Sequence, residues 1–528
     1  MSVFYPPLIP SEHYFQETIK DKTGAEAMPY ACLHGGSLCL LISLLSCLGA
    51  QAVQTLHLVQ LVHRHGARSP KVKHNQSQIC GEVPCGYLNA AGKMMLINAG
   101  EFLRNHYNSN ASEPFFPEES YNSCVTYSRS TDVPRTLQSA GCLLRGMFPN
   151  ASEFFPAIHT ADVSTDWLLR YDVIPQAYAF SHLDEHWWRN VCNPKLDTLI
   201  DTNTLLSVSR EVFSEGFCAD PQNRCHCAAT LFDIGVAMQS DGRIDKHPLL
   251  RENLGRLRDI KFFEDSHRFV YNASDRTHAK MGSLGQHLAQ EILKNAENHM
   301  NGLTSYKLYH YSAHDTTIAP LAATLGDSTT TGITPPYGQL YAFELLYDHE
   351  VKGYIIRIRR GAPGQKPEEG YAFSWGEFQM KCMNENHTVY TVEDNKCPYH
   401  DFRRFVKSTK PHDPAGLCYL NRRYRELFHC PGNVGKPPNK QCKVFRRVCP
   451  AWSCEEGYTL NSVTLECVCS SRKCMESRDL SISTDTLGRN LFTIFIFVLL
   501  ALLIPIFSVF VCIGKKLRAR TRRTRAKG

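Results

Sequence analysis

The hydrophobic positions of this 528-residue chain fall into short runs and two longer ones. The short runs, 56–62, 124–127 and 306–311, are rich in β-branched, aromatic and leucine residues and end at polar residues. Such runs are typical of strands buried in a sheet. Helix-like patterns follow them at 88–107, 133–145 and 280–293. This alternation predicts an α/β fold with a mostly parallel central sheet flanked by helices.

The longest run, 491–513, contains 23 residues without a charge, and eight Lys or Arg residues follow it within 514–528. A run of this length is typical of a transmembrane helix, and the basic tail indicates that the C-terminus faces the cytosol. We therefore predict a transmembrane helix at 491–513 and a basic cytosolic tail at 514–528.

The second long run, 37–48, is rich in leucine and precedes Ala50 and Ala52. A short apolar core followed by small residues at this spacing is typical of a secretory signal peptide. Met28 begins a segment of ordinary signal length, so we expect it to be the true start. Residues 1–52 are thus read as an N-terminal extension and signal peptide. The chain becomes a single-pass type I membrane protein with a lumenal or extracellular ectodomain.

The net charge of the chain is explained by this predicted membrane topology. The formal net charge of +7 arises from the eight cations of the tail, and the rest of the chain carries about −1. The basic balance therefore reflects membrane topology and gives no indication of nucleic-acid binding.

Cysteines and glycosylation sequons agree with an oxidising compartment. Of 22 cysteines, 18 lie outside the signal region and the membrane run, which predicts nine disulfides. Cys225, His226 and Cys227 allow a zinc reading, but adjacent ligands suit zinc poorly, so disulfides are expected there. Five N-glycosylation sequons are present, at Asn75, Asn110, Asn150, Asn272 and Asn386.

Reactive side chains follow the strand-like runs. Arg64, His65 and Arg68 come after the first, Arg129 after the second, and His314 with Asp315 after the third. Parallel sheets bind ligands beyond the carboxyl ends of their strands, so we expect these side chains to meet. Arginine forks match phosphate oxygens and an imidazole can attack phosphorus. Gly66 is expected to let the backbone approach the anion. Taken alone, an Arg-His-Gly tripeptide is also compatible with a solvated turn.

At these residues the chain resembles the histidine acid phosphatase family, the branch of the histidine phosphatases with a His-Asp pair. The resemblance extends from about residue 55 to 407. It rests on LVHRHGARSP (61–70), YSRSTDVPRTLQSAGCLLRGMFP (127–149) and YSAHDTTIAPLAATLG (311–326), with further similarity at 88–107, 280–293, 339–348 and 354–361.

The resemblance implies a role for each matched residue. His65 is the nucleophile that becomes a phosphohistidine, and Asp315 is the proton donor to the leaving alcohol. Phosphate is held by Arg64, Arg68, Arg129 and His314, and neither a metal nor a cofactor is required. Asp315 is equally compatible with an N-cap of the following helix. We expect His63 to be structural or at the rim of the cleft.

The implied function is that of a membrane-bound acid phosphatase acting on phosphate monoesters of small molecules or phosphoproteins. It would be located in the endosome or lysosome or at the cell surface, and a homodimer is a candidate assembly. One alternative is a vestigial phosphatase that serves as a receptor or adhesion protein through its Cys-rich part. Another is an inositol polyphosphate phosphatase of the phytase type, which the His-Asp pair disfavours.

These observations predict a particular domain order. A phosphatase domain at 53–407 contains a helical cap inserted at about 150–278, whose tryptophans are expected to be core residues. A Cys-rich module at 408–476 has few apolar runs, so disulfides must hold it together. A linker at 477–490 leads to the membrane run.

Overall fold

The computed structural model describes residues 54–72, 79–109, 113–173, 187–213, 218–221, 223–427, 429–430, 438–472, 491–505 and 513–515. Several predicted features lie outside these residues. They are the extension and signal peptide at 1–52, the linker at 477–490, most of the tail at 514–528, and the sequons at Asn75 and Asn110.

The unit that begins at Gln54 is built around an eight-stranded sheet of order β10-β6-β5-β1-β4-β2-β3, with β7 paired to β6. Strands β1, β4, β2 and β3 are parallel neighbours, whereas β5, β6, β7 and β10 pair antiparallel. The bounds are β1 Gln54–Arg64, β2 Thr126–Ser130, β3 Ile158–His159, β4 Leu308–Ala313, β5 Leu340–Asp348, β6 Gly353–Pro363, β7 Phe373–Gly376 and β10 Lys396–Pro398. A two-stranded sheet, β8 Lys381–Met383 and β9 Val389–Thr391, lies apart from it.

The prediction of an α/β fold is confirmed, but the prediction of a mostly parallel sheet is wrong. The sheet is mixed because β5 and β6 are joined by a tight hairpin at 349–352, and a hairpin can join only antiparallel strands. The parallel half carries the strand ends at which the reactive residues were found.

Strand β1 is buried on both faces. Leu58 and Val62 point into one hydrophobic core, and Val59 and Leu61 point into the other. This alternation between two cores is what an uninterrupted apolar run in a central strand requires.

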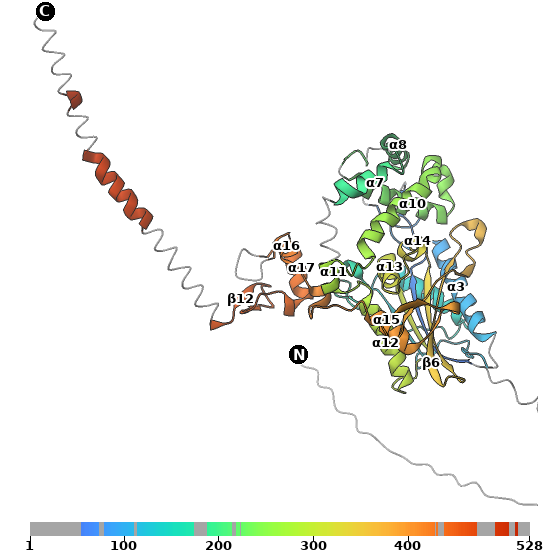
Figure 1. Ribbon diagram of the computed structural model, residues 1–528. Coiled ribbons are helices and arrows are strands. Elements are labelled where there is room, and N and C mark those ends of the chain that lie inside the picture. Colours follow the sequence, from blue (N-terminus) through green and yellow to red (C-terminus); the bar gives the residue numbers. More distant parts are fainter. Residues whose placement is uncertain are drawn as a thin grey trace, which may run out of the picture. The chain divides into compact units, whose positions relative to one another are not determined.

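Helices cover both faces of the sheet (Figure 1). Helices α3 and α4 cover one face, and α12, α13 and α15 cover the other. Where α3 and α4 cross, a Cβ at Gly100 would lie 2.1 Å from the carbonyl oxygen of Leu143, so only glycine permits this approach. The bounds are α3 Ala90–Asn108, α4 Pro134–Met147, α12 Gln286–Met300, α13 Asp315–Thr324, α14 Thr330–Ile333 and α15 Tyr399–Lys407.

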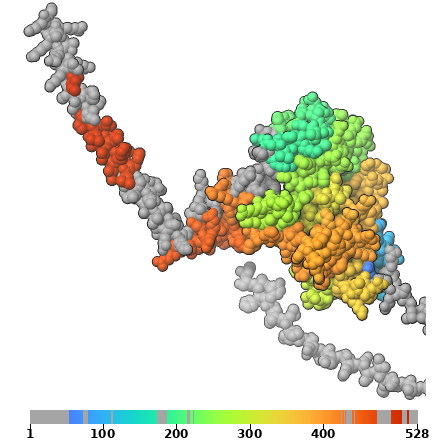
Figure 2. All heavy atoms as spheres, in the orientation of Figure 1, coloured from blue at the N-terminus to red at the C-terminus, as the bar shows by residue number. Residues whose placement is uncertain are grey.

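The predicted cap is a separate helical cluster with its own core. It contains a π-helical turn at Trp188–Cys192 and helices α7 Asn193–Asp197, α8 Thr202–Phe213, α9 Arg224–Ser240 and α10 Pro248–Phe269. Trp187 and Trp188 pack against this core, as expected. Helix α10 contacts α13 and α14, so the cap is seated next to the sheet domain (Figure 2). The predicted cap boundary at 150 is wrong, since β3 within it pairs with β2 of the sheet.

The Cys-rich module has a small core made largely of cystines. Leu420 and Phe445 are buried among four half-cystines, and Trp167, which lies outside the module, packs against them. The elements of the module are α16 Arg422–Leu427, α17 Lys440–Val448, β11 Tyr458–Leu460 and β12 Cys467–Cys469. One further helix, α11 Arg276–Met281, precedes α12 in the chain. The module is thus held by disulfides, as its composition predicts.

The expectation of nine disulfides is wrong. Cys124 is a free, exposed thiol and Cys142 a free, half-buried one, because neither has a second sulfur within bonding distance. Cys469 is disulfide-bonded. The Cys225–Cys227 segment forms disulfides, as predicted. The pairs are Cys80–Cys85, Cys192–Cys225, Cys218–Cys227, Cys382–Cys397, Cys418–Cys449, Cys430–Cys442 and Cys454–Cys467.

Residues 491–505 of the predicted membrane run are helical, with their apolar side chains exposed. Residues 506–512 of that run lie outside the described chain. Within the part that the structure describes, none of the helices is both long and apolar enough to cross a membrane.

Candidate active site

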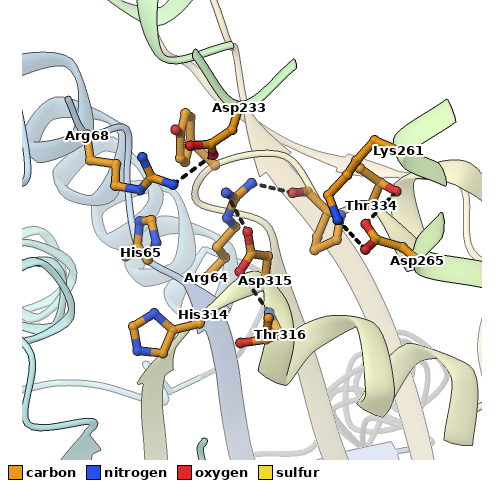
Figure 3. A network of polar contacts seen from close by, with 12 residues as sticks. Arg64, His65, Arg68, Asp233, Lys261, Asp265, His314, Asp315, Thr316 and Thr334 are labelled. Atoms are coloured by element: carbon orange, nitrogen blue, oxygen red, sulfur yellow. Dashed lines mark hydrogen bonds and ion pairs between the residues drawn. The ribbon is translucent and has the colours of Figure 1, made fainter. Parts of the chain in front are cut away.

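The pairing of β1 with β4 places the first and third reactive segments together. Arg64 lies opposite Ala313 in this parallel pair, and the backbone N–H of His65 donates to the Ala313 carbonyl over 2.9 Å. His65 and Arg64 therefore leave the sheet beside His314 and Asp315 (Figure 3). Strand β2 flanks β4 on its other side and leads directly into α4.

His65 is buried, with 2% of its surface exposed, and its tautomer is fixed. Its Nδ1 lies 2.8 Å from the carbonyl oxygen of Gly66. A carbonyl oxygen can only accept a hydrogen bond, so Nδ1 carries the proton and Nε2 keeps a free lone pair. The Nε2 atom of this imidazole can therefore accept a bond.

The surroundings of His65 keep this imidazole neutral. Burial lowers the pKa of His65 well below its ordinary value, and the positive charges of Arg135 and Arg64 lower it further. An ordinary histidine would be protonated in an acidic compartment, whereas this one retains its lone pair.

Arg64, next to His65 in the chain, forms an ion pair with Asp315. One guanidinium nitrogen donates to the carbonyl of Pro335 over 2.6 Å and the other donates to the Asp315 carboxylate over 2.9 Å. Burial alone would raise the pKa of Asp315, but the charges of Arg64 and its neighbours hold that pKa well below the usual range. Asp315 is the first residue of α13, whose N-cap is His314, so the alternative of Asp315 as N-cap is wrong.

Arg68 is held by the cap. Its guanidinium donates to the carboxylate of Asp233 on α9 over 2.7 Å. The aromatic ring of Tyr337 lies beside both arginines, with its centroid 4.3 Å from the Arg64 guanidinium carbon and 5.9 Å from that of Arg68. The Tyr337 hydroxyl is buried and has no hydrogen-bond partner among the described residues.

A third cation, Arg135, completes the cluster. Arg135, in the first turn of α4, donates to Nδ1 of His314 over 3.2 Å. Nδ1 therefore accepts, and Nε2 of His314 donates to the Thr131 hydroxyl over 3.0 Å. Burial lowers the pKa of Arg135 to about 10, and Arg68 and Arg64 contribute to the shift. Crowding of three guanidiniums around one imidazole is costly without an anion, and a tetrahedral oxyanion would relieve it.

Comparison with known proteins agrees with this geometry. The profile of the histidine phosphatase superfamily (branch 2) matches residues 55–359. The chain belongs to this superfamily. Lysosomal acid phosphatase of Xenopus laevis is 30% identical over 372 residues, which cover 64% of this chain and 78% of the relative. Prostatic acid phosphatase of Mus musculus is 28% identical over 355 residues, covering 62% and 85%.

Among solved structures, the phytase from Citrobacter braakii superimposes with a TM-score of 0.50 at 14% identity, over 67% of this chain and 98% of the phytase. At this identity the likeness shows a shared fold alone. The superfamily match and the acid phosphatase homologues together make this chain a phosphatase enzyme.

Within this histidine phosphatase, the structure does not bring Arg129 to the imidazole. Arg129 donates to Asp166 over 2.6 Å, and the Asp166 side chain is fully buried. The cations that act on His65 are Arg135, Arg64 and Arg68. Arg129 therefore forms a structural ion pair. Arg135 lies beside His65, in the place that was predicted for Arg129.

The sequence pattern did not single out Arg135, because this residue lies several positions beyond the strand-like run 124–127. The available signal was its position at the start of a helix, where backbone N–H groups and the helix dipole favour an anion. Asp233 and Tyr337 were also missed. They come from the cap and from the segment before β5, and no strand-end pattern marks either position.

Two neighbours of His65 have roles in packing. A Cβ at Gly66 would lie 2.2 Å from the carbonyl oxygen of Gly92, so this glycine admits helix α3, and its close approach to an anion stays a prediction. His63 is fully buried, and its Nε2 lies 2.9 Å from Nε2 of His310 on β4. His63 is therefore structural, which was one of the two roles expected for it.

A cleft of about 700 Å³ opens beside Asp315 and Arg64, between α9 and α10 of the cap and the segment 330–337. Across the residues that the structure describes, no group of three or more His, Cys, Asp or Glu side chains is arranged to hold a metal ion. Of the sequons within them, Asn272 and Asn386 are exposed, whereas Asn150 is half-buried and donates to Ser120.

Proposed function

We propose that this protein is a membrane-bound acid phosphatase that hydrolyses phosphate monoesters through a phosphohistidine at His65. One observation carries the proposal. A neutral imidazole with a free Nε2 lies among Arg64, Arg68 and Arg135 and faces the carboxyl group of Asp315. Similarity to lysosomal and prostatic acid phosphatases supports the substrate class.

In the first step Nε2 of His65 attacks phosphorus, and an N–P bond forms as the bond to the ester oxygen breaks. The three arginines offset the charge on the equatorial oxygens. His314 is proposed as a further donor, which requires that its Nδ1 gains a proton and exchanges its hydrogen bond from Arg135 for one to the phosphate. An alkoxide leaves poorly, so Asp315 gives its proton to the departing oxygen. In the second step Asp315 takes a proton from water, which attacks phosphorus and frees His65 and inorganic phosphate.

The proton on Asp315 must be accounted for, because Arg64 keeps this carboxyl ionised in the free protein. A bound phosphate competes for Arg64 and adds negative charge beside Asp315, which favours the protonated acid. The proton can arrive with a monoanionic ester, whose second pKa is about 6. We therefore expect kcat/KM to fall about tenfold per pH unit above pH 6.

Assay of p-nitrophenyl phosphate hydrolysis from pH 4 to 8 tests the proposal. Wild-type protein should show an acid optimum, and His65→Ala should abolish activity, whereas His226→Ala, an exposed histidine of the cap, should retain it. A folded wild type without activity would favour the alternative of a vestigial phosphatase domain acting through its Cys-rich module.

The proposal includes attachment to a membrane by residues 491–513. The catalytic domain would then lie in the endosomal or lysosomal lumen or outside the cell. The proposal also includes a homodimer. The protein should remain in the membrane pellet after alkaline carbonate extraction, and a version ending at residue 476 should be secreted. Light scattering of that secreted form would report its oligomeric state.

A further inference from the structure

The cleft beside Asp315 lies where the alcohol part of a substrate must go. It is lined at one end by Arg64 and Asp315, and Asp315 is the group proposed to protonate the leaving oxygen. A phosphate held by the arginine cluster therefore directs its ester oxygen into this cleft. Its volume of about 700 Å³ is that of a pocket for a drug-sized molecule and far exceeds the space that a phosphate needs.

The wall of the cleft that belongs to the cap carries apolar side chains among charged and polar ones. Phe232 and Val236 of α9 and Leu254 of α10 line it and are only half-buried. Pro336 and the ring of Tyr337 are among the apolar lining residues contributed by the 330–337 segment. Half-buried apolar side chains around a concave surface are typical of a site for an apolar group.

Gly255 keeps this cleft open. It lies inside helix α10, where glycine costs about 1 kcal/mol relative to alanine, and nothing lies within 4 Å of the position that its Cβ would take. Because Gly255 itself lines the cleft, any larger side chain there would occupy the space beside Leu254.

The charges of the cleft argue against a polyphosphate. Its five lining cations each have a carboxylate partner within 4.0 Å. These pairs are Arg64–Asp315, Arg251–Asp245, Arg258–Asp259, Lys261–Asp265 and Lys366–Glu368. Asp233 and Asp265 also face the cleft. Asp233 is paired with Arg68 and Asp265 with Lys261. A second phosphate would thus find no unpaired cation among these lining residues and would have to displace a carboxylate from its partner.

We infer that this cleft is a leaving-group site that selects phosphate monoesters of bulky apolar alcohols, aryl esters in particular, over sugar and polyol phosphates. The inference rests on the proposed phosphatase function and specifies the substrate class of the same site. Part of the substrate's binding free energy would come from removing the apolar group from water against α9 and α10.

The test compares 2-naphthyl phosphate with glycerol 2-phosphate as substrates of the full-length protein, wild type beside Gly255→Leu. The variant should lower kcat/KM for the naphthyl ester about tenfold or more and change that for the glycerol ester less than about twofold. Gly141→Leu is the matched control. It also replaces an open helical glycine, on α4 and away from the cleft, and should leave the ratio unchanged.

The possible results distinguish the leaving-group site from the proposed phosphatase function. Equal losses for both esters, or none for either, would overturn the leaving-group site while leaving the phosphatase function intact. Wild-type turnover of inositol hexakisphosphate as fast as that of the naphthyl ester would also overturn it. A wild type that hydrolyses no ester would contradict the proposed function itself. Thermal unfolding of both variants checks that they fold, and both should match or exceed the wild type.

Discussion

Arg129 and Arg135 are six residues apart in the chain, but Arg129 pairs with the carboxylate of Asp166 and Arg135 donates to His314. Arg135→Ala removes a cation beside His65 and His314, so phosphate and vanadate should bind about tenfold more weakly or worse. Arg129→Ala leaves the buried carboxylate of Asp166 without its partner, which should cost about 3 kcal/mol of unfolding free energy. Equilibrium dialysis and urea unfolding of both variants measure these effects, and an exchange of the two phenotypes would contradict the assignment.

The hydroxyl of Tyr337 has no partner in the described chain, which suggests a contact with bound substrate. Tyr337→Phe removes an unsatisfied buried group, so stability should stay within about 0.5 kcal/mol of wild type or rise, while vanadate affinity falls about fivefold. Tyr341→Phe is the control. Its hydroxyl donates to Asp327 over 2.6 Å, so this variant should lose about 1 kcal/mol and keep its vanadate affinity. Unchanged affinity in Tyr337→Phe would exclude the contact.

At the residue scale, the sequence located His65, Arg64, His314 and Asp315 because each follows a strand end of the parallel half. It could not distinguish Arg129 from Arg135, since both lie close to the end of β2 and only the direction of the side chains separates them. The geometry resolves this, because Arg129 points to Asp166 and Arg135 points to His314.

Among the elements, β1 and β4 carry a buried histidine pair that links stability to pH. His63 and His310 are fully buried in contact, and Nδ1 of His310 lies 2.7 Å from the Ser128 hydroxyl. Burial lowers the pKa of His63 to about 4, and burial also lowers that of His310. Both rings are therefore neutral in the folded protein across most of the acidic range.

Between pH 6.5 and 4 the unfolded chain binds a proton at His63 and the folded protein does not, so stability falls as pH falls. The loss is on the order of 3 kcal/mol for His63 and is present in full below about pH 4. Urea unfolding at a series of pH values should show this slope, and His63→Gln should flatten it. The exposed His226→Gln should not change it. An equal slope in His63→Gln would contradict the role of the pair.

The strands also show which features the hydrophobic pattern of the sequence cannot predict. Uninterrupted apolar runs predict β1 and β4 as central strands, and both are buried on two faces. The same pattern cannot reveal strand direction, and the antiparallel pair of β5 and β6 was expected only from the resemblance of 339–348 and 354–361 to a hairpin of the family. Likewise β3 is only two residues long and leaves no period to recognise.

For the molecule as a whole, the described covalent cross-links are disulfides in the sheet domain, the cap and the Cys-rich module. We expect a chelator to leave activity and melting temperature unchanged, because arginines supply the charge that a metal would provide. A reductant should lower the melting temperature, since each native disulfide contributes about 2–5 kcal/mol. Calorimetry and activity after each treatment test this, and inactivation by the chelator would reopen the question of a metal.

The family resemblance predicted a phosphatase domain with a cap, and composition predicted a cystine-held module after it. Neither predicted that Trp167, which lies outside the module, packs into it, because a contact between distant segments leaves no local pattern. An even number of cysteines also proved insufficient, since Cys124 and Cys142 are free.

The central claim is that His65 carries the phosphoryl group. The most direct measurement is rapid acid quenching of the protein during turnover of a ³²P-labelled monoester, with mild handling, alkaline denaturation and peptide mapping. We expect an acid-labile, base-stable label on the peptide that contains His65, absent in His65→Ala and retained in His226→Ala. Turnover without such a label in the wild type, or the same label in His65→Ala, would contradict the phosphohistidine mechanism.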